Sequence, residues 1–375
     1  MRTFFRIMAA WNLLAQLPLA LALWLALRST LPALPLALGL CALALGLWAL
    51  SFGRVNLLAH DRPVSTLRRR ALELPYMAHL MAGWLGVLLL LPLWFLGDNV
   101  HHAVIVSALV LLALALYGVG PGRVWLKVER HTIALDKSLG ARNSLTIAHW
   151  SDVHLGSMTS KERVLTWVAK SNALGADMVV VTGDVISNGT QFLNDIAESM
   201  GALRAPMGVY FIPGNHDYFG AGEPLFQLLR DKGVRVLRNA SIELEPGLRI
   251  VGVDDTWTRS ADVPRAFEDA RPGKETVLCL VHDPGLAEAC ANQGADVILC
   301  GHTHAGQVAI PFAARLANVG RLAYRYSYGV YRIGSATLYV HPGMGTTGPP
   351  VRLGVRPTVA LLTVVGKSAR GTVEP

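Results

Sequence analysis

The chain has 375 residues, of which 52% are hydrophobic, and it carries a formal net charge of +8 at pH 7. Its mean hydropathy of +0.38 exceeds the norm for a soluble globular protein. The excess charge belongs to residues 1–142, with 13 basic and 5 acidic residues, because residues 143–375 contain 21 of each. This distribution excludes a basic nucleic-acid footprint on the second part, so we expect no nucleic-acid partner.

The first 122 residues contain four apolar segments that are each about long enough to cross a bilayer. They run roughly over residues 7–27, 33–52, 76–97 and 101–120. A cleaved signal peptide would explain only the first of them. None of the four contains an acidic residue, which gives no sign of an ion pathway. We therefore predict that residues 1–122 form an all-α, four-helix, multi-pass transmembrane anchor.

The basic residues of the connecting loops predict the orientation of this anchor. The loop between the second and third segments carries five arginines: Arg54, Arg62, Arg68, Arg69 and Arg70. The loop at residues 97–102 carries no lysine or arginine, whereas five basic residues follow the fourth segment within residues 123–142. Because short basic loops stay on the cytoplasmic side, we expect the N-terminus and the second half of the chain to be cytoplasmic.

We expect residues 123–143 to be a linker, residues 144–366 a second domain and residues 367–375 a tail. Short strand-like apolar runs recur in this domain: Leu145–Trp150, Met178–Thr182, Gly208–Ile212, Leu248–Val253, Val277–Val281 and Val297–Cys300. Amphipathic segments separate several of them: Lys161–Ala173, Gln191–Leu203, Pro224–Lys232 and Pro284–Gln293. This alternation predicts a layered α/β domain with buried strands. The four cysteines show no CxxC spacing, which favours buried, reduced thiols.

Five of the apolar runs end in polar clusters, namely SDVH, TGD, PGNHD, VHD and CGHTH. In open α/β sheets, ligands bind at the carboxyl ends of strands, where loops converge. The candidate metal ligands are Asp152, His154, Asp184, Asn215, His282, His302 and His304. Each motif alone can be an ordinary turn, but all five at strand ends point to a site. Seven ligands without a thiolate predict two bridged divalent ions, with Mn, Fe and Zn as candidates.

The order of these motifs resembles that of the calcineurin-like metallophosphoesterases over about residues 145–345. The resemblance implies a four-layer α/β/β/α sandwich, in which helices flank two stacked sheets. It also implies a division of the ligands, with one ion held by Asp152, His154 and His304. The other ion would be held by Asn215, His282 and His302, with Asp184 as the bridge. Many members carry a further Asp three residues after the Asp of the GD motif, where this chain has Ser187.

The neighbouring residues suggest how such a site would work. Two cations neutralise phosphate oxygens and activate water for in-line attack. His216, next to Asn215, is the candidate for protonating the leaving oxygen or stabilising the transition state. Asp217 is a candidate catalytic residue that orients His216, and the alternative is that it only caps the turn.

The C-terminal stretch from Val297 to Val373 contains no acidic residue. Its eight basic residues are Arg315, Arg321, Arg325, Arg332, Arg352, Arg356, Lys367 and Arg370. A positive, aromatic-rich segment of this kind suits an anionic substrate or anionic headgroups. Ordinary surface arginines are the alternative. Arg352 and Arg356 are the candidate substrate-phosphate contacts.

The segment Leu338–Pro357 resembles the tail of a bacterial subgroup of transmembrane proteins with a metallophosphoesterase domain, which is similar to UDP-2,3-diacylglucosamine pyrophosphatases. We therefore expect a bacterial inner-membrane phosphodiesterase or pyrophosphatase that acts on a lipid-linked, phosphorylated substrate. The first alternative is the UDP-2,3-diacylglucosamine pyrophosphatase of lipid A biosynthesis. The second is a non-catalytic membrane sensor of metal or phosphate, which loss of a ligand would favour.

Overall fold

The computed structural model describes residues 10–59, 64–89, 101–219 and 221–367. The chain divides into two compact units. The first comprises Met1–Gly122 together with Gly348–Leu353, and the second comprises Arg123–Thr347 and Gly354–Pro375. The division at Gly122 coincides with the expected end of the anchor, but six residues from the C-terminal part join the first unit.

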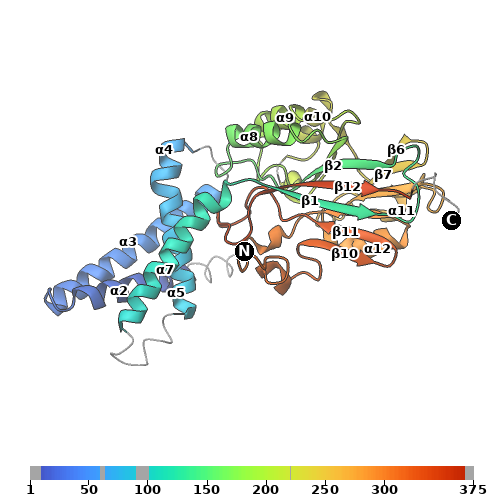
Figure 1. The fold of residues 1–375 in the computed structure, drawn as a ribbon. Coiled ribbons are helices and arrows are strands. Elements are labelled where there is room, and N and C mark those ends of the chain that lie inside the picture. Colours follow the sequence, from blue (N-terminus) through green and yellow to red (C-terminus); the bar gives the residue numbers. More distant parts are fainter. Residues whose placement is uncertain (1–9, 60–63, 90–100, 220, 368–375) are drawn as a thin grey trace. The chain divides into compact units, whose positions relative to one another are not determined.

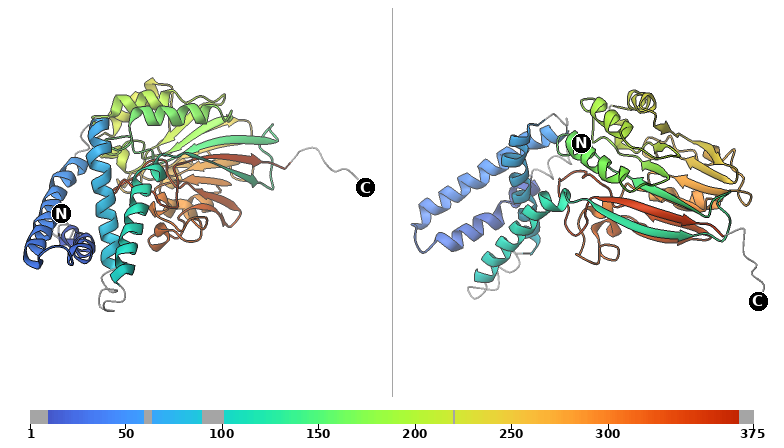
Figure 2. Two further views of the ribbon diagram at one scale, coloured as in Figure 1. Left: turned by 60° about the vertical axis from the view of Figure 1, so that its left-hand side comes forward. Right: turned by 45° about the horizontal axis from the view of Figure 1, so that its top comes forward.

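The first unit consists of apolar helices rich in leucine and alanine, which are strong helix formers (Figure 2). Its longer helices are α2 (Leu17–Leu27), α3 (Ala33–Ala59), α5 (Leu74–Leu89) and α7 (His101–Val119). Three helices of the described part are long and apolar enough to cross a membrane: Ala10–Leu27, Ala33–Leu50 and His102–Arg123. These helices indicate membrane association. Helix α5 covers the first part of the span expected at residues 76–97, and residues 90–100 lie outside the described residues.

The second unit contains two six-stranded mixed sheets. The first has the order β1-β12-β2-β3-β4-β5, and the second has the order β10-β11-β9-β8-β7-β6. The strands of the first sheet are β1 (Lys127–Ala134), β2 (Ser144–Trp150), β3 (Met178–Thr182), β4 (Val209–Ile212), β5 (Arg235–Val236) and β12 (Thr358–Val365). Those of the second are β6 (Ala240–Glu245), β7 (Leu248–Gly252), β8 (Thr276–Leu280), β9 (Val297–Cys300), β10 (Gly329–Ile333) and β11 (Ala336–Val340).

The two sheets stack face to face, with helices on both outer faces, as the resemblance implied (Figure 1). The apolar layer between the sheets includes Ile147 and Val180 from one side and Leu278 and Leu299 from the other. One outer face is covered by α8 (Lys161–Asn172), α9 (Leu193–Gly201) and α10 (Glu223–Asp231). The other is covered by α11 (Val263–Ala266) and α12 (Ala287–Asn292).

We expected residues 123–143 to be a linker, but the structure corrects this, because these residues contain strand β1. This strand pairs in parallel with β12 over its full length, from Lys127 opposite Thr358 to Ala134 opposite Val365. Strand β1 lies at the sheet edge and reads KVERHTIA, with exposed polar residues between buried ones. Edge strands carry such charged positions, so a search for continuous apolar runs misses them.

The topology brings the carboxyl ends of the central strands to one edge of each sheet. Strands β2, β3 and β4 are mutually parallel, as are β7, β8 and β9. All five polar motifs begin at the last residue of one of these strands or directly after it, and they meet where the ends of the two sheets face each other. The main-chain N–H of His302, after β9 of the second sheet, donates to Oδ2 of Asp152, after β2 of the first, at 3.1 Å. Such bonds fix the loops that carry the side chains.

Candidate metal centre

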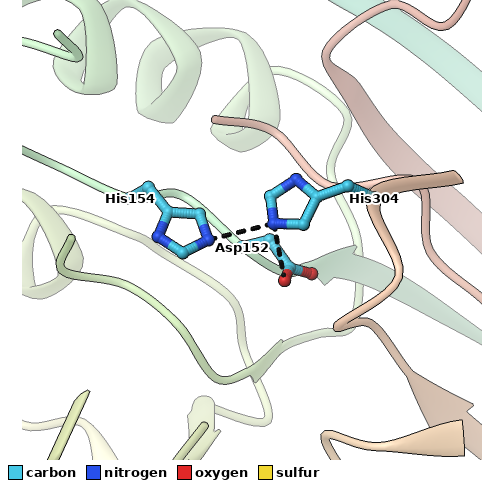
Figure 3. Close-up of side chains that lie close together, drawn as sticks. All are labelled: Asp152, His154 and His304. Carbon is cyan, nitrogen blue, oxygen red and sulfur yellow. Dashed lines mark hydrogen bonds and ion pairs between the residues drawn. The ribbon is translucent and has the colours of Figure 1, made fainter. Parts of the chain in front are cut away.

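One group of ligands joins the loop after β2 to the loop after β9. Asp152, His154 and His304 present ligand atoms that all lie within 4.8 Å of one another (Figure 3). Nε2 of His304 lies 3.0 Å from Nε2 of His154 and 3.2 Å from Oδ1 of Asp152. Two imidazole nitrogens that face each other this closely need a proton or a cation between their lone pairs.

A second group joins the loop after β3 to the loops after β8 and β9. Asp184, His282 and His302 also present ligand atoms within 4.8 Å of one another. Nε2 of His282 lies 3.3 Å from Oδ2 of Asp184 and 3.2 Å from Nδ1 of His302. The same Oδ2 of Asp184 lies 3.6 Å from Nε2 of His154 in the first group. Asp184 therefore stands between the two groups, in the position of a bridging ligand.

Asn215 supplies the remaining ligand and gives the fit test for a metal. Its side chain is buried, and its Oδ1 has no hydrogen-bond partner. A buried amide oxygen without a partner is unfavourable by about 1–3 kcal/mol, whereas a cation would satisfy it. Gly214, before it, has no room for a side chain, because a Cβ there would lie 2.3 Å from Oδ1 of Asp184. The residues therefore fit a pair of divalent ions.

The backbone of the ligand loops is strained where the ligands project. Asp152, His154, Asp184, His302 and His304 all have positive φ angles, between 46° and 67°. Non-glycine residues rarely adopt this region, which costs about 1–3 kcal/mol at each position. The surrounding sheet ends hold the loops in this conformation, so the donor atoms are pre-organised for a ligand.

The charges inside the site depend strongly on one another. Burial lowers the pKa of His282, but Asp184 outweighs burial and raises that pKa to about 10. Burial raises the pKa of Asp184, and His282 and His154 outweigh it and hold it well below its usual range. The pair thus retains a proton between carboxylate and imidazole, where a divalent cation would take its place. Burial, followed by His216, lowers the pKa of His154 well below its usual value, which keeps that ring neutral for ligation.

His216 lies beside the ligands and is held through its main chain and its ring. Its ring Nδ1 lies 2.6 Å from the carbonyl oxygen of Ser187 and donates to it. Oγ of Ser187 donates to the carbonyl of His154 at 2.9 Å. At the position where many relatives carry an Asp, the main chain of Ser187 thus orients the ring. Nε2 of His216 stays available, 3.4 Å from Oγ1 of Thr347.

Asp217 has a different set of partners from the one expected. Oδ2 accepts the N–H groups of Asp184 and Gly214, at 2.8 and 2.9 Å. Oδ1 accepts those of Val185 and Ile186, at 2.9 and 3.3 Å. Burial, and then the charge of Asp184, raise the pKa of Asp217 to about 7, while these donors act in the opposite direction.

None of the hydrogen bonds of the described residues joins the Asp217 carboxylate to the ring of His216. The expected catalytic role therefore becomes a positioning role, because Asp217 ties the loop of the bridging Asp184 to the loop of Asn215. Main-chain donors from distant strands cannot be predicted from the spacing of a motif, which explains the difference.

Several residues that contact the ligands were not predicted from the sequence. Nδ1 of His282 donates to the carbonyl of Thr182 at 2.7 Å, and Oγ1 of Thr182 lies 2.8 Å from Nε2 of buried His149. These contacts orient a ligating imidazole from behind. The hydroxyl of Tyr324 lies 3.2 Å from Nε2 of His302. The motifs gave no signal for these residues, because stacking of the two sheets brings them together.

The two arginines expected at the substrate belong to different units of the chain. Arg352 is fully buried in the first unit, and its main-chain N–H donates to the carbonyl of Gly118 at 2.9 Å. Nε of Arg356 donates to the carbonyl of Trp125 at 3.0 Å. The guanidinium of Arg356 is thus bonded just before β1, and the role of both arginines at phosphate stays a prediction.

Comparisons with known proteins agree with this site. Residues 145–306 match the family described as calcineurin-like phosphoesterase. The chain is 32% identical over 269 residues to a "Transmembrane protein with metallophosphoesterase domain" from Danio rerio, covering 67% of this chain and 60% of that protein. It is 31% identical over 250 residues to an "Uncharacterized metallophosphoesterase" from Aquifex aeolicus, covering 65% of this chain and 93% of that protein.

Among solved structures, the chain is similar to a dimetal phosphatase from Danio rerio, with a TM-score of 0.35 and 15% identity over 60% of this chain and 99% of that one. The Aquifex relative is covered almost entirely, and the family match contains the whole run of motifs from Asp152 to His304. The chain therefore belongs to the calcineurin-like metallophosphoesterases, which are metal-dependent phosphoester hydrolases.

Proposed function

We propose that this chain hydrolyses a phosphodiester or pyrophosphate bond in a lipid-linked substrate, at the cytoplasmic face of a bacterial inner membrane. The observation that carries the proposal is a set of three overlapping three-residue ligand groups, two of which contain Asp184. These residues would hold two divalent ions, which would neutralise phosphate oxygens and activate water. Mn, Fe and Zn all suit this set of carboxylate, amide and imidazole donors.

The residues around the ligands have three further roles, which are proton delivery, positioning of the ligand loops and orientation of the ligand rings. Ser187 fixes Nδ1 of His216, so Nε2 is the atom that can deliver a proton to the leaving oxygen. Asp217 holds the loop of Asp184 against Gly214, which keeps the ligands in one arrangement. Tyr324 and Thr182 orient the rings of His302 and His282 through their outer nitrogens.

Membrane association supports a lipid-linked substrate. Three helices among the described residues are long and apolar enough to span a bilayer, so the site is tethered where phospholipids and lipid-linked intermediates are concentrated. The arginine-rich, helical segment around Arg68 favours the cytoplasmic side, where nucleotide-linked lipids are available. UDP-2,3-diacylglucosamine, a precursor of lipid A, combines a pyrophosphate with two acyl chains and is one such substrate.

The test compares membranes of a strain lacking the gene with the same strain carrying the wild-type chain or Asp152→Asn. Lipid mass spectrometry should find a phosphorylated lipid that accumulates in the deletion strain. The wild-type chain should remove it, and Asp152→Asn should not. Accumulation of UDP-2,3-diacylglucosamine itself would identify the lipid A step. If the wild-type chain and Asp152→Asn both removed the lipid, hydrolysis at this site would be contradicted. If the lipids were unchanged while the chain hydrolysed a water-soluble phosphoester, the lipid-linked substrate would be contradicted.

A further inference from the structure

One loop of the second unit presents five large apolar side chains to solvent. We define the apolar loop as residues 310–322, in which the exposed fractions are 61% for Ile310, 109% for Phe312, 79% for Leu316, 48% for Val319 and 88% for Leu322. Single exposed apolar residues are normal on a protein surface. Five within thirteen residues form a patch of the kind that marks an interaction site.

The main chain of the apolar loop is folded onto itself. The N–H of Ile310 donates to the carbonyl of Ala317 at 2.9 Å, which closes the loop. The side chain of Asn318 donates to the carbonyl of Ala314 at 2.7 Å and accepts the N–H of Arg321 at 3.1 Å. Backbone groups that already have partners can enter an apolar medium without a large penalty. The loop thus combines apolar tips with an internally bonded backbone.

The apolar loop is anchored beside the first residues of β1. Nη2 of Arg315 lies 2.5 Å from Oε1 of Glu129, which also accepts the hydroxyl of Tyr328. Glu129 is the third residue of β1, which begins at Lys127. The charge of Arg315 is thus paired with Glu129. The loop lies close to the start of β1, where the chain enters the second unit.

The chain connects that point to the last membrane-spanning candidate over a short distance. The candidate span His102–Arg123 ends four positions before Lys127. A fully extended chain covers at most about 14 Å over four residues. Trp125, which is exposed, lies within this connection, and tryptophan is enriched where a chain crosses the membrane–water interface. Only residues 124–126 thus separate the last candidate span from β1, the strand to which the loop is anchored.

The same edge of the sheets carries the metal ligands. Strand β1 is parallel to β12, and β12 is antiparallel to β2. Strand β1 therefore starts at the edge where β2 ends, and Asp152 follows β2 directly. The site and the apolar loop share one end of the second unit.

The charge around the apolar loop suits an anionic surface. The sequence from Val297 to Val373 has no acidic residue. Arg325 is paired with Glu288, as Arg315 is with Glu129. Within the described residues, Arg321 makes no ion pair with a carboxylate, and it lies next to the exposed Leu322. A cation beside apolar tips is the pattern of a segment that binds anionic lipid headgroups.

We propose that the apolar loop inserts into the surface of an anionic bilayer and forms a second membrane contact of the chain, in addition to its spanning helices. The apolar tips would enter the region between headgroups and acyl chains, and Arg321 would bind a lipid phosphate. This contact would hold the ligand-bearing edge of the sheets at the interface. The inference concerns the bilayer surface and stands whether or not the substrate is a lipid.

The test uses the full chain in lipid nanodiscs. Cys41 is exposed and is first replaced by Ala, since the other three cysteines are buried and free. A nitrobenzoxadiazole fluorophore is then attached at Phe312→Cys or, as a control, at Lys274→Cys. Lys274 is an exposed residue just before β8, at the edge opposite His282. The discs contain phosphatidylglycerol, with or without a lipid that carries a doxyl quencher near its headgroup.

The label at residue 312 should show blue-shifted emission and several-fold stronger quenching by the doxyl lipid than the label at residue 274. Equal quenching at the two positions would overturn the proposal. A blue shift at residue 312 without quenching by lipid would also overturn it, because a second copy of the chain or another protein would then cover the loop. Energy transfer between labelled copies in discs that hold two chains would identify a second copy of the chain as the partner, and its absence would point to another protein.

A second arm tests the charge. In the protein labelled at residue 312, Arg321→Gln should lower the ratio of inserted to free loop by about fivefold in phosphatidylglycerol discs, and have little effect in phosphatidylcholine discs. The matched control is Lys274→Gln, which removes one positive charge from the opposite edge. It should not change the ratio of inserted to free loop in either kind of disc. An equal effect of Arg321→Gln in both kinds of disc would overturn the role of the headgroup charge.

Discussion

Oδ1 of Asp184 accepts the main-chain N–H of His216 at 2.8 Å. This bond links the carboxylate between the two ligand groups to the residue that follows Asn215. Oδ2 of the same carboxylate lies near Nε2 of His282 and Nε2 of His154. One side chain thus sets the spacing of three loops, and its charge is needed for both groups.

The first prediction concerns that carboxylate. Asp184→Asn should reduce the metal content of the purified chain from about two divalent ions to one or none, and abolish hydrolysis, because a neutral amide is a poor bridge between two cations. Elemental analysis after gel filtration measures the content. Asp231→Asn, at an exposed helix end, is the control and should keep both ions. Full activity with a single ion bound would contradict the two-metal site.

The second prediction concerns His216. His216→Ala should keep both ions but lower kcat by roughly 10²-fold or more, as expected for a lost general acid. The loss should be smaller for substrates with good leaving groups, which need no proton. Steady-state rates on a series of aryl phosphoesters with different leaving groups measure this. An equal loss across the series would assign His216 to stabilising charge and not to proton transfer.

The third prediction concerns Asp217 as a positioning residue. Asp217→Asn puts an NH₂ group against main-chain N–H donors and leaves at least one of them without an acceptor. We expect a loss of stability of about 1–3 kcal/mol, and a metal affinity reduced by about 10–100-fold. Thermal unfolding and metal titration measure the two effects. Excess metal should restore much of kcat, which loss of a reacting group would not allow.

Asp262→Asn is the matched control for this experiment. Asp262 accepts one N–H, from Arg265 at 3.0 Å, at the exposed start of α11. Asparagine caps a helix about as well as aspartate. The control should therefore leave stability and metal affinity nearly unchanged, and a loss as large as that of Asp217→Asn would point to a general effect of removing carboxylates.

The sequence allowed prediction of the layered α/β unit and of its ligand candidates, because buried parallel strands are apolar and stop where polar loop residues begin. Each of the predicted strand-like runs overlaps a strand of β2, β3, β4, β7, β8 or β9. Strand β1 was missed, since its polar residues alternate with buried ones at a sheet edge.

The partners of Asp217 and the contact of Thr182 with His149 could not be predicted for a different reason. Both depend on how loops and strands that are distant in sequence meet, and a local motif holds no information about that. The apolar loop was also not expected, because exposure of Phe312 and Leu322 is a property of the folded chain and not of its composition.

The fourth prediction concerns the buried carboxylate of Glu129. Burial raises its pKa, but hydrogen bonds from His131 and Arg315 outweigh burial and hold the pKa well below the usual 4.5. A pKa lowered on folding adds stability above the unfolded value, and this stability is lost as the pH falls through and below about 4.5. Glu129→Gln should therefore destabilise the chain by about 1–3 kcal/mol at pH 7 and by less as the solution is acidified.

Thermal unfolding midpoints of the wild-type chain and of Glu129→Gln, measured from about pH 3 to about pH 8, give this difference in stability. Glu198→Gln serves as the control, because the Glu198 carboxylate is half-exposed and pairs with Lys161 at the surface. An exposed pair of this kind is screened by solvent and contributes little to stability. A gap between wild type and Glu129→Gln that stays constant with pH would show that the charge of Glu129 is not what stabilises the fold.

The last prediction concerns orientation, which decides the substrates that the site can reach. The helical segment that carries Arg68, Arg69 and Arg70 should lie in the cytoplasm, because translocating a short basic segment is disfavoured. Two further spans would then return the chain to the same side and place Asp152 there. A reporter that is active only in the periplasm should stay silent when fused after Pro375, and should work when inserted within residues 97–102. A cytoplasmic reporter should give the opposite pattern at both sites. Activity of the periplasmic reporter after Pro375 would invert the protein and exclude every nucleotide-linked lipid, since those are made and held on the cytoplasmic side.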